Sequence, residues 1–289
     1  MGGPSRQGHR QDHARHPGDS AIDDHMTSLA TGPRLRPNGA PALELDGLSK
    51  TFGSTVAADA IRLEVPVGSF FGLVGPNGAG KTTSLSMAVG LLRPDAGTAR
   101  VFGLDVWSDP VDAKPLLGVL PDGLALPERL TGREVLTFLG LLRGLDEASV
   151  QERADELLRV LDLDDAEHTL VIEYSTGMRK KIGLAAALIH APRLLVLDEP
   201  FEAVDPIAAA TIRVILGRFV ASGGSVVFSS HVLAVVEQLS TDVAMIADGR
   251  VVASGPLDQV RGGRSLEAVF IDLAGTEVGG GEGLEWLVS

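Results

Sequence analysis

A glycine-rich segment has the residue types needed to bind a chain of phosphates. It reads Gly75-Pro76-Asn77-Gly78-Ala79-Gly80-Lys81-Thr82-Thr83. Glycine permits the backbone conformations that turn consecutive N–H groups toward an anion, and a helix that begins near Gly80 would direct its positive end at the same anion. Lys81 can place a catalytic positive charge on the outer phosphates, and the Thr82 hydroxyl can ligate Mg²⁺. The segment therefore predicts a site for a nucleoside triphosphate and Mg²⁺.

Two adjacent carboxylates follow a short apolar run at 194–197. Such a run predicts a buried strand, and open α/β sheets bind their ligands at the carboxyl ends of their strands. Asp198 is suited to hold Mg²⁺ through its water shell, and Glu199 can orient or deprotonate an attacking water molecule. A solvated strand end is the simpler interpretation of this pair. The phosphate-binding segment upstream favours hydrolysis.

The elements that must position these residues alternate along the chain. Apolar runs predict strands at 43–45, 61–65, 69–74, 118–120, 194–197, 225–228 and 243–246. Helical spacing predicts helices at 82–92, 131–143, 147–161, 176–190, 206–220 and 231–238. This alternation indicates an α/β fold with a mostly parallel sheet. The stretch at about 122–180 is helical without strands, and it predicts an inserted helical subdomain whose first helix Thr131 would cap.

Both ends of the chain differ in composition from the middle. Residues 1–41 are rich in Gly, Pro, Arg, Asp and His, which predicts a disordered N-terminal extension. His9, His13, His16 and His25 lie in it, but their loose spacing favours a solvated tail over a metal-binding tract. Residues 261–289 predict a short helix at 265–273 followed by a flexible Gly- and Glu-rich tail.

The charge balance and the hydropathy pattern exclude several classes of protein. The net charge is −13, whereas a protein that grips nucleic acid or a broad anionic lipid face needs a basic surface. No stretch approaches the roughly 20 apolar residues of a membrane-spanning helix, and the N-terminus lacks the apolar core of a signal peptide. We expect a soluble protein that reaches a membrane only through a partner. The absence of Cys fits a reducing cytosol.

A third motif, Tyr174-Ser175-Thr176-Gly177-Met178, resembles the signature sequence of ABC ATPases in a variant form. The resemblance covers about 43–273. It implies a P-loop NTPase core with a mostly parallel sheet, an antiparallel β subdomain and an inserted helical subdomain, together spanning 42–260. It also implies that Ser175 and Gly177 bind the γ-phosphate of an ATP molecule held by a second subunit.

Further positions match the family one at a time. Phe52 stands where an aromatic side chain stacks on the nucleotide base, Asp205 where a carboxylate contacts the opposing subunit, and His231, expected to begin a helix, where a histidine contacts the γ-phosphate. Asp122 departs from the family, which commonly has Gln there. An acidic residue at this position could ligate Mg²⁺ more strongly. The alternative is that Asp122 only caps a turn before Gly123.

The resemblance to bacterial multidrug and antibiotic efflux ATPases implies a function. Two copies would form a head-to-tail homodimer around two ATP molecules, at the inner face of the cell membrane. Hydrolysis would power export of a drug-like or other small hydrophobic substrate through a separate transmembrane permease, with no nucleic acid involved. Two alternatives stay open: a soluble ABC-type ATPase acting on ribosomes or DNA, and a regulatory nucleotide-binding module of low turnover.

Overall fold

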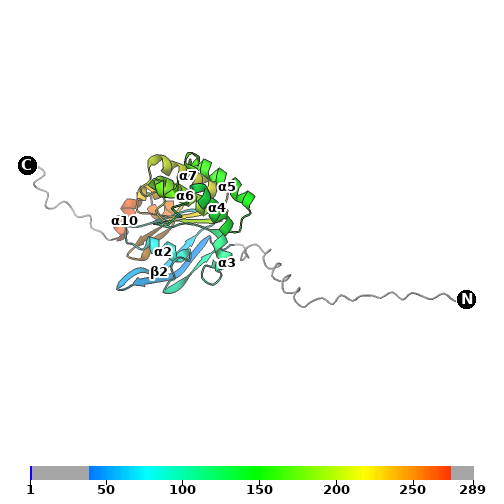
Figure 1. Cartoon of the computed structure of the whole chain (residues 1–289). Helices are drawn as coiled ribbons and strands as arrows, with labels where there is room; N and C mark the ends of the chain where they lie inside the picture. Colours follow the sequence, from blue (N-terminus) through cyan, green and yellow to red (C-terminus); the bar gives the residue numbers. More distant parts are fainter. Residues whose placement is uncertain (2–38, 275–289) are drawn as a thin grey trace, which may run out of the picture. The chain divides into compact units, whose positions relative to one another are not determined.

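The larger of two sheets has six strands in the order β10–β9–β3–β8–β7–β6 (Figure 1). The computed structural model describes Met1 and residues 39–274. The strands are β3 (Phe70–Val74), β6 (Leu117–Leu120), β7 (Leu194–Leu197), β8 (Ser225–Ser230), β9 (Asp242–Ala247) and β10 (Arg250–Pro256). All neighbours pair in parallel except β9 and β10, which pair antiparallel. The mostly parallel sheet is confirmed, and the apolar runs of β3 and β7 are buried throughout, as expected for a sheet covered on both faces.

The smaller sheet has four antiparallel strands in the order β2–β1–β4–β5. They are β1 (Leu43–Phe52), β2 (Thr55–Val65), β4 (Ala96–Val101) and β5 (Leu104–Asp105). The antiparallel β subdomain implied by the resemblance is therefore present. The apolar pattern located β1 and β2 but not β4 or β5. Strand β5 has only two residues, and β4 carries Gly97, Thr98 and Arg100 rather than an apolar run.

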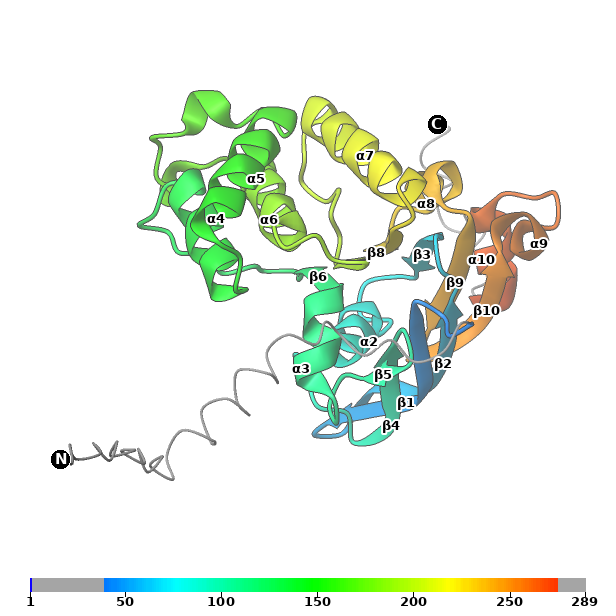
Figure 2. The same ribbon diagram turned by 90° about the vertical axis from the view of Figure 1, so that its right-hand side faces the viewer.

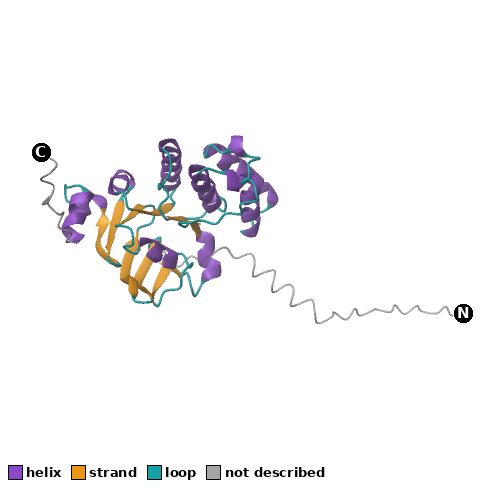
Figure 3. Cartoon of the chain, turned by 60° about the vertical axis from the view of Figure 1, so that its left-hand side comes forward, coloured by secondary structure: helices purple, strands orange, loops and turns teal. Residues whose placement is uncertain are grey.

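Helix α2 (Lys81–Ala88) lies between the two sheets (Figure 3). Its Leu85, Met87 and Ala88 belong to a buried apolar cluster that includes strand residues from both sheets. The helix is shorter than predicted at 82–92, because the chain leaves it at Val89 and Gly90 adopts a left-handed conformation with φ 78°. Burial of α2 fixes the glycine-rich segment that precedes it.

Three helices form a group on one side of the larger sheet, drawn in green in Figure 2. They are α4 (Gly132–Leu142), α5 (Glu147–Val160) and α6 (Thr176–Leu188), with short 3₁₀ turns at Asp164–Ala166 and Val171–Glu173 between the last two. Thr131 caps α4 in a reciprocal capping box with Glu134, which confirms the predicted cap. Helix α6 runs past residue 180 and packs against β6, so it joins this group to the sheet.

The remaining helices are α3 (Pro110–Ala113), α7 (Pro206–Ala221), α8 (Leu233–Leu239), α9 (Leu257–Arg261) and α10 (Leu266–Ala274). Helix α10 agrees with the helix predicted at 265–273. Helix α8 starts at Leu233, so the expectation that His231 begins a helix is wrong: His231 lies in a bend that follows β8. None of the helices in the described part of the chain is long and apolar enough to cross a membrane. The structure describes only Met1 and residues 39–41 of the extension that is predicted to be disordered at 1–41. The rest of that extension and the predicted flexible tail at 275–289 lie outside the described residues.

Candidate active site

The glycine-rich segment connects the buried strand β3 to the buried helix α2. Gly78 and Gly80 have φ values of 82° and 102°, a region that side chains disfavour. Space is a second constraint. A Cβ atom at Gly75 would lie 2.2 Å from the carbonyl oxygen of Ile246, and one at Gly80 would lie 2.2 Å from that of Ala57. Glycine is therefore required here both by backbone conformation and by close packing.

Lys81 is the first residue of α2, and its side chain is buried. The Nζ atom donates to the carbonyl oxygens of Gly75 (2.7 Å) and Pro76 (3.2 Å). It also lies 3.5 Å from Oε1 of Glu199. The buried ammonium is thus held by the loop itself and by the predicted catalytic carboxylate. A buried charge needs such partners, since desolvation would otherwise cost several kcal/mol.

Glu199 is held in an unusual conformation by several contacts. Its φ is 45°, in the left-handed region that a non-glycine residue seldom adopts. Its N–H donates to Oγ of Ser229 (2.8 Å), whose hydroxyl donates to the carboxylate of Asp198. Its Oε2 lies 3.2 Å from Nδ1 of His231. The predicted catalytic residues Lys81, Glu199 and His231 are therefore brought together, with the carboxylate between the two basic side chains.

An open cleft of about 300 Å³ lies over the glycine-rich segment. Its lining combines glycines with residues that carry hydroxyl, ammonium and carboxylate groups: Ala57, Asn77, Gly78, Gly80, Lys81, Thr82, Thr83, Asp122, Glu199 and Glu202. Eight of the residues predicted to bind nucleotide, metal or water thus line one cleft. The sequence did not point to Ala57 or Glu202. Ala57 belongs to β2 of the smaller sheet, and no local sequence pattern predicts that β2 lies next to the glycine-rich segment.

Asp122 both caps a turn and lies at the cleft, so the structure is compatible with both interpretations of this residue. Its Oδ1 accepts the N–H of Gly123 (2.9 Å), so the carboxylate does cap the turn. It also lines the cleft with Thr82 and Glu199. The side chain is exposed, which leaves its second oxygen accessible to an ion.

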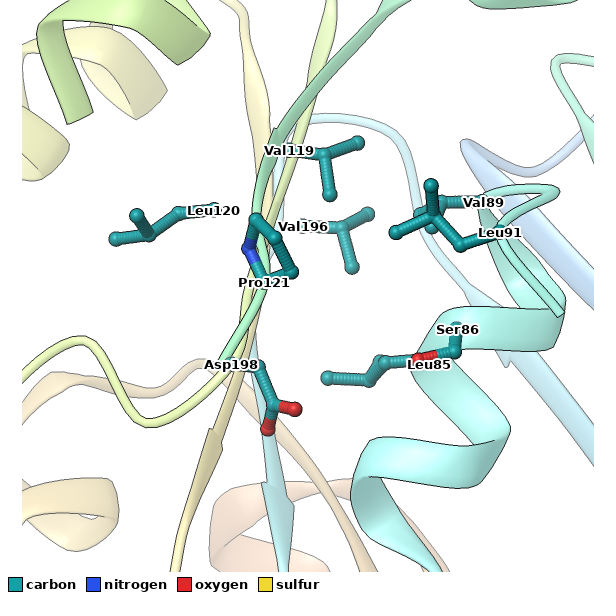
Figure 4. Close-up of a pocket in the computed structure, with 9 residues that line it drawn as sticks. All are labelled: Leu85, Ser86, Val89, Leu91, Val119, Leu120, Pro121, Val196 and Asp198. Carbon is teal, nitrogen blue, oxygen red and sulfur yellow. The ribbon is translucent and has the colours of Figure 1, made fainter. Parts of the chain in front are cut away.

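Asp198 lies beside the cleft rather than in it. Its carboxylate is buried and borders a small cavity between β7 and α2, next to Leu85 and Ser86 (Figure 4). Within the described residues no three His, Cys, Asp or Glu side chains cluster as metal ligands. Mg²⁺ needs no such cluster, because it usually takes one or two carboxylates with substrate phosphates and water. The oxygen atoms of Thr82, Asp122 and Asp198 are of the kind that Mg²⁺ prefers, and the first two line the cleft.

Phe52 ends β1, and half of its side chain is exposed. The ring has Lys50 Nζ 5.7 Å from its centroid and belongs to the same hairpin as Ala57 of the cleft. An exposed aromatic face on this hairpin is available to stack on a base.

The signature residues form a second group around the start of α6. Ser175 caps that helix by accepting the N–H of Met178 (3.2 Å). A Cβ atom at Gly177 would lie 3.1 Å from Oδ2 of Asp205, which caps α7. The N–H groups of Ala208 and Ile207, with the nearby charge of Lys181, hold the pKa of Asp205 below its usual range. Ser175, Gly177 and Asp205 are absent from the lining of the cleft.

Residues 58–202 match the family model described as ABC transporter. The chain belongs to the ABC transporter family, as an ATP-binding protein. It is 40% identical to the daunorubicin/doxorubicin resistance ATP-binding protein DrrA of Streptomyces peucetius, over 76% of this chain and 67% of that protein. It is 36% identical to the bacitracin transport ATP-binding protein BcrA of Enterococcus faecalis, over 73% and 68%.

The fold agrees with this family. A solved ATP-binding subunit of an ABC transporter superimposes with a TM-score of 0.75 at 29% identity, over 80% of this chain and 99% of that one. The predicted fold class is confirmed, and ATP is the nucleotide that ABC ATPases bind. No sequence pattern singles out Ser229. Its hydroxyl, on β8, joins two adjacent residues that follow β7, and this contact depends on the pairing of the two strands.

Proposed function

We propose that this chain is the ATP-hydrolysing subunit of an exporter, and that it drives a drug-like or other small hydrophobic substrate through a separate transmembrane permease. Two observations support the proposal. The cleft joins an ATP-binding loop to Glu199, which His231 contacts, and the similar proteins are named for daunorubicin/doxorubicin resistance and bacitracin transport. The names of these similar proteins support the proposed class of substrate, and the residues of the cleft support the proposed ATPase chemistry.

Residues of the cleft and of its surroundings have separate parts in this mechanism. Backbone N–H groups of the glycine-rich segment and the Lys81 ammonium bind the phosphates, while Phe52 stacks on the base. Thr82, Asp122 and Asp198 would hold Mg²⁺, which neutralises charge that develops on the phosphates. Glu199 orients the attacking water and accepts its proton. His231 lies within hydrogen-bonding distance of Glu199, and in this proposal it would contact the γ-phosphate.

A second copy of the chain completes the site in this proposal. Ser175 and Asp205 are exposed and lie outside the cleft of their own chain. A helix N-terminus such as that of α6 can bind a γ-phosphate through its N–H groups. A head-to-tail homodimer would bring Ser175 and Gly177 of one chain to the ATP of the other. Hydrolysis would then open the dimer and move a permease at the inner face of the cell membrane.

The alternatives receive less support. The relatives cited above are transport and resistance proteins, and a net charge of −13 disfavours direct action on ribosomes or DNA. A regulatory module of low turnover needs no carboxylate poised between an ammonium and an imidazole, as Glu199 is.

Co-expression with a candidate transmembrane permease tests the proposal. We expect the two proteins to purify together, and we expect cells that contain both to extrude an anthracycline faster than cells with either alone. The Glu199→Gln variant, matched in size and expression, should abolish this efflux. Efflux that is equal with the variant, or a chain that purifies with ribosomes instead, would contradict the proposal.

A further inference from the structure

Lys180 connects the signature helix to the catalytic carboxylate of the same chain. It lies one turn into α6, and its Nζ donates to the backbone carbonyl oxygen of Glu199 (2.9 Å). That carbonyl also accepts the N–H of Glu202 (3.2 Å), which belongs to the loop that continues to Asp205. The ammonium of Lys180 is partly buried, so this charge-assisted hydrogen bond is shielded from competing water.

The backbone of Glu199 needs such restraint. A left-handed conformation is unfavourable for a residue with a side chain, and it persists only where surrounding contacts impose it. Here the Ser229 hydroxyl holds the N–H of Glu199, and Lys180 holds its carbonyl oxygen. The two bonds bracket the Cα atom from which the catalytic side chain projects. The direction of the carboxylate between Lys81 and His231 depends on both.

We propose that Lys180 is a positioning residue for ATP hydrolysis, which fixes the backbone of Glu199 and links it to the position of α6. This inference rests on the proposed role of Glu199 as the water-orienting base. Ser175 and Gly177 begin the same helix, and in the proposed dimer they would face the ATP of the partner. A shift of α6 caused by that ATP would therefore reach Glu199 of its own chain through Lys180. Binding of ATP at one site would thus affect the position of Glu199 at the other site through the side chain of Lys180.

The neighbouring lysine does not share this role. Nζ of Lys181 lies 3.4 Å from Oδ2 of Asp162, within the helical group, and its charge acts on Asp205. Arg179 binds the carbonyl oxygens of Tyr174 and Ile172, in the segment that precedes α6. Of the three consecutive basic residues, Lys180 is the one that contacts Glu199.

Steady-state ATPase kinetics of the purified full-length chain test this role. Lys180→Met keeps the length of the side chain but removes the donor. We expect kcat to fall about tenfold or more, since small misplacements of a catalytic group have such effects, while KM for ATP changes less than about twofold. Lys180→Arg keeps donors at the end of a similar stem and should restore most of kcat. Lys114→Met, which removes an exposed amine outside the cleft, is the matched control and should hydrolyse like the wild type.

The outcomes separate this inference from the proposed function. If Lys180→Met retains the wild-type kcat, or if Lys180→Arg loses as much as Lys180→Met, the positioning role is wrong. A fall in kcat that accompanies an equal weakening of ATP affinity would also overturn it, because that pattern indicates general damage to the site. Glu199→Gln is measured in the same series. Wild-type turnover by that variant would instead overturn the proposed role of Glu199, and the inference with it.

Discussion

Individual side chains in this site have two tasks each, one structural and one chemical. Asp122 caps a turn through Oδ1 and borders the cleft. Asp205 caps α7 and approaches Gly177 of the signature. Ser229 joins the backbone of Glu199 to the carboxylate of Asp198. A substitution at such a position must therefore separate the two tasks before its effect on activity can be assigned.

Asp122→Asn makes this separation for the proposed Mg²⁺ site. The Asn Oδ1 atom can still accept the N–H of Gly123, so thermal stability should stay unchanged, while the charged oxygen is lost. If Asp122 helps to hold Mg²⁺, the Mg²⁺ concentration for half-maximal ATPase activity should rise about tenfold. Titration of ATPase activity with Mg²⁺ at saturating ATP measures this. An unchanged Mg²⁺ requirement would leave Asp122 as a turn cap only.

At the scale of elements, helix α6 connects several parts of the site. Its start carries the signature residues, its first turn reaches Glu199 through Lys180, and its body packs against β6. Immediately beyond its end, Nε2 of His190 lies 2.8 Å from the carbonyl oxygen of Leu117 at the start of β6. The helix thus joins the helical group to the sheet at both of its ends.

The His190 contact predicts a dependence of stability on pH. Burial, assisted by the charge of Arg143, lowers the pKa of His190 to about 4. In the unfolded chain it titrates near 6.5, so the unfolded state binds more protons between these values. The neutral imidazole therefore contributes its full stabilisation above about pH 6.5, and this is lost progressively as the pH falls toward 4.

His190→Gln retains an N–H donor for Leu117 and removes the titration. We expect the free energy of unfolding to fall less between pH 7 and pH 5 in this variant than in the wild type. Urea denaturation followed by circular dichroism at the two pH values measures the difference. Identical losses in the two proteins would show that His190 is not the group that titrates.

The sequence predicted elements well where one local pattern decides them. Buried strands β3 and β7, the cap at Thr131 and the start of α6 at Ser175 are all set by neighbouring residues. It missed β4, whose polar composition resembles a loop, and it placed the start of α8 two residues early. Contacts between segments that are distant in the sequence could not be predicted from local patterns. The bonds from Lys180 and Ser229 to Glu199 depend on how α6, β7 and β8 pack, which no short pattern encodes.

At the scale of the whole molecule, the functional residues fall into two groups. One contains the cleft residues with Lys81, Glu199 and Asp122, and the other contains Ser175, Gly177 and Asp205 at the starts of α6 and α7. The signature group is absent from the lining of the cleft. In the proposed head-to-tail dimer, a second copy would bring its signature group to this cleft, with ATP between the two chains.

The mass of the Glu199→Gln variant in the presence of ATP and Mg²⁺ tests this account most directly. The substitution keeps the side chain's size but removes the base, so ATP should remain bound and hold two chains together. Light scattering coupled to size-exclusion chromatography should give twice the 30.2 kDa mass of one chain with ATP, and the single-chain mass without nucleotide. A variant that binds ATP and stays at 30.2 kDa would contradict the shared site.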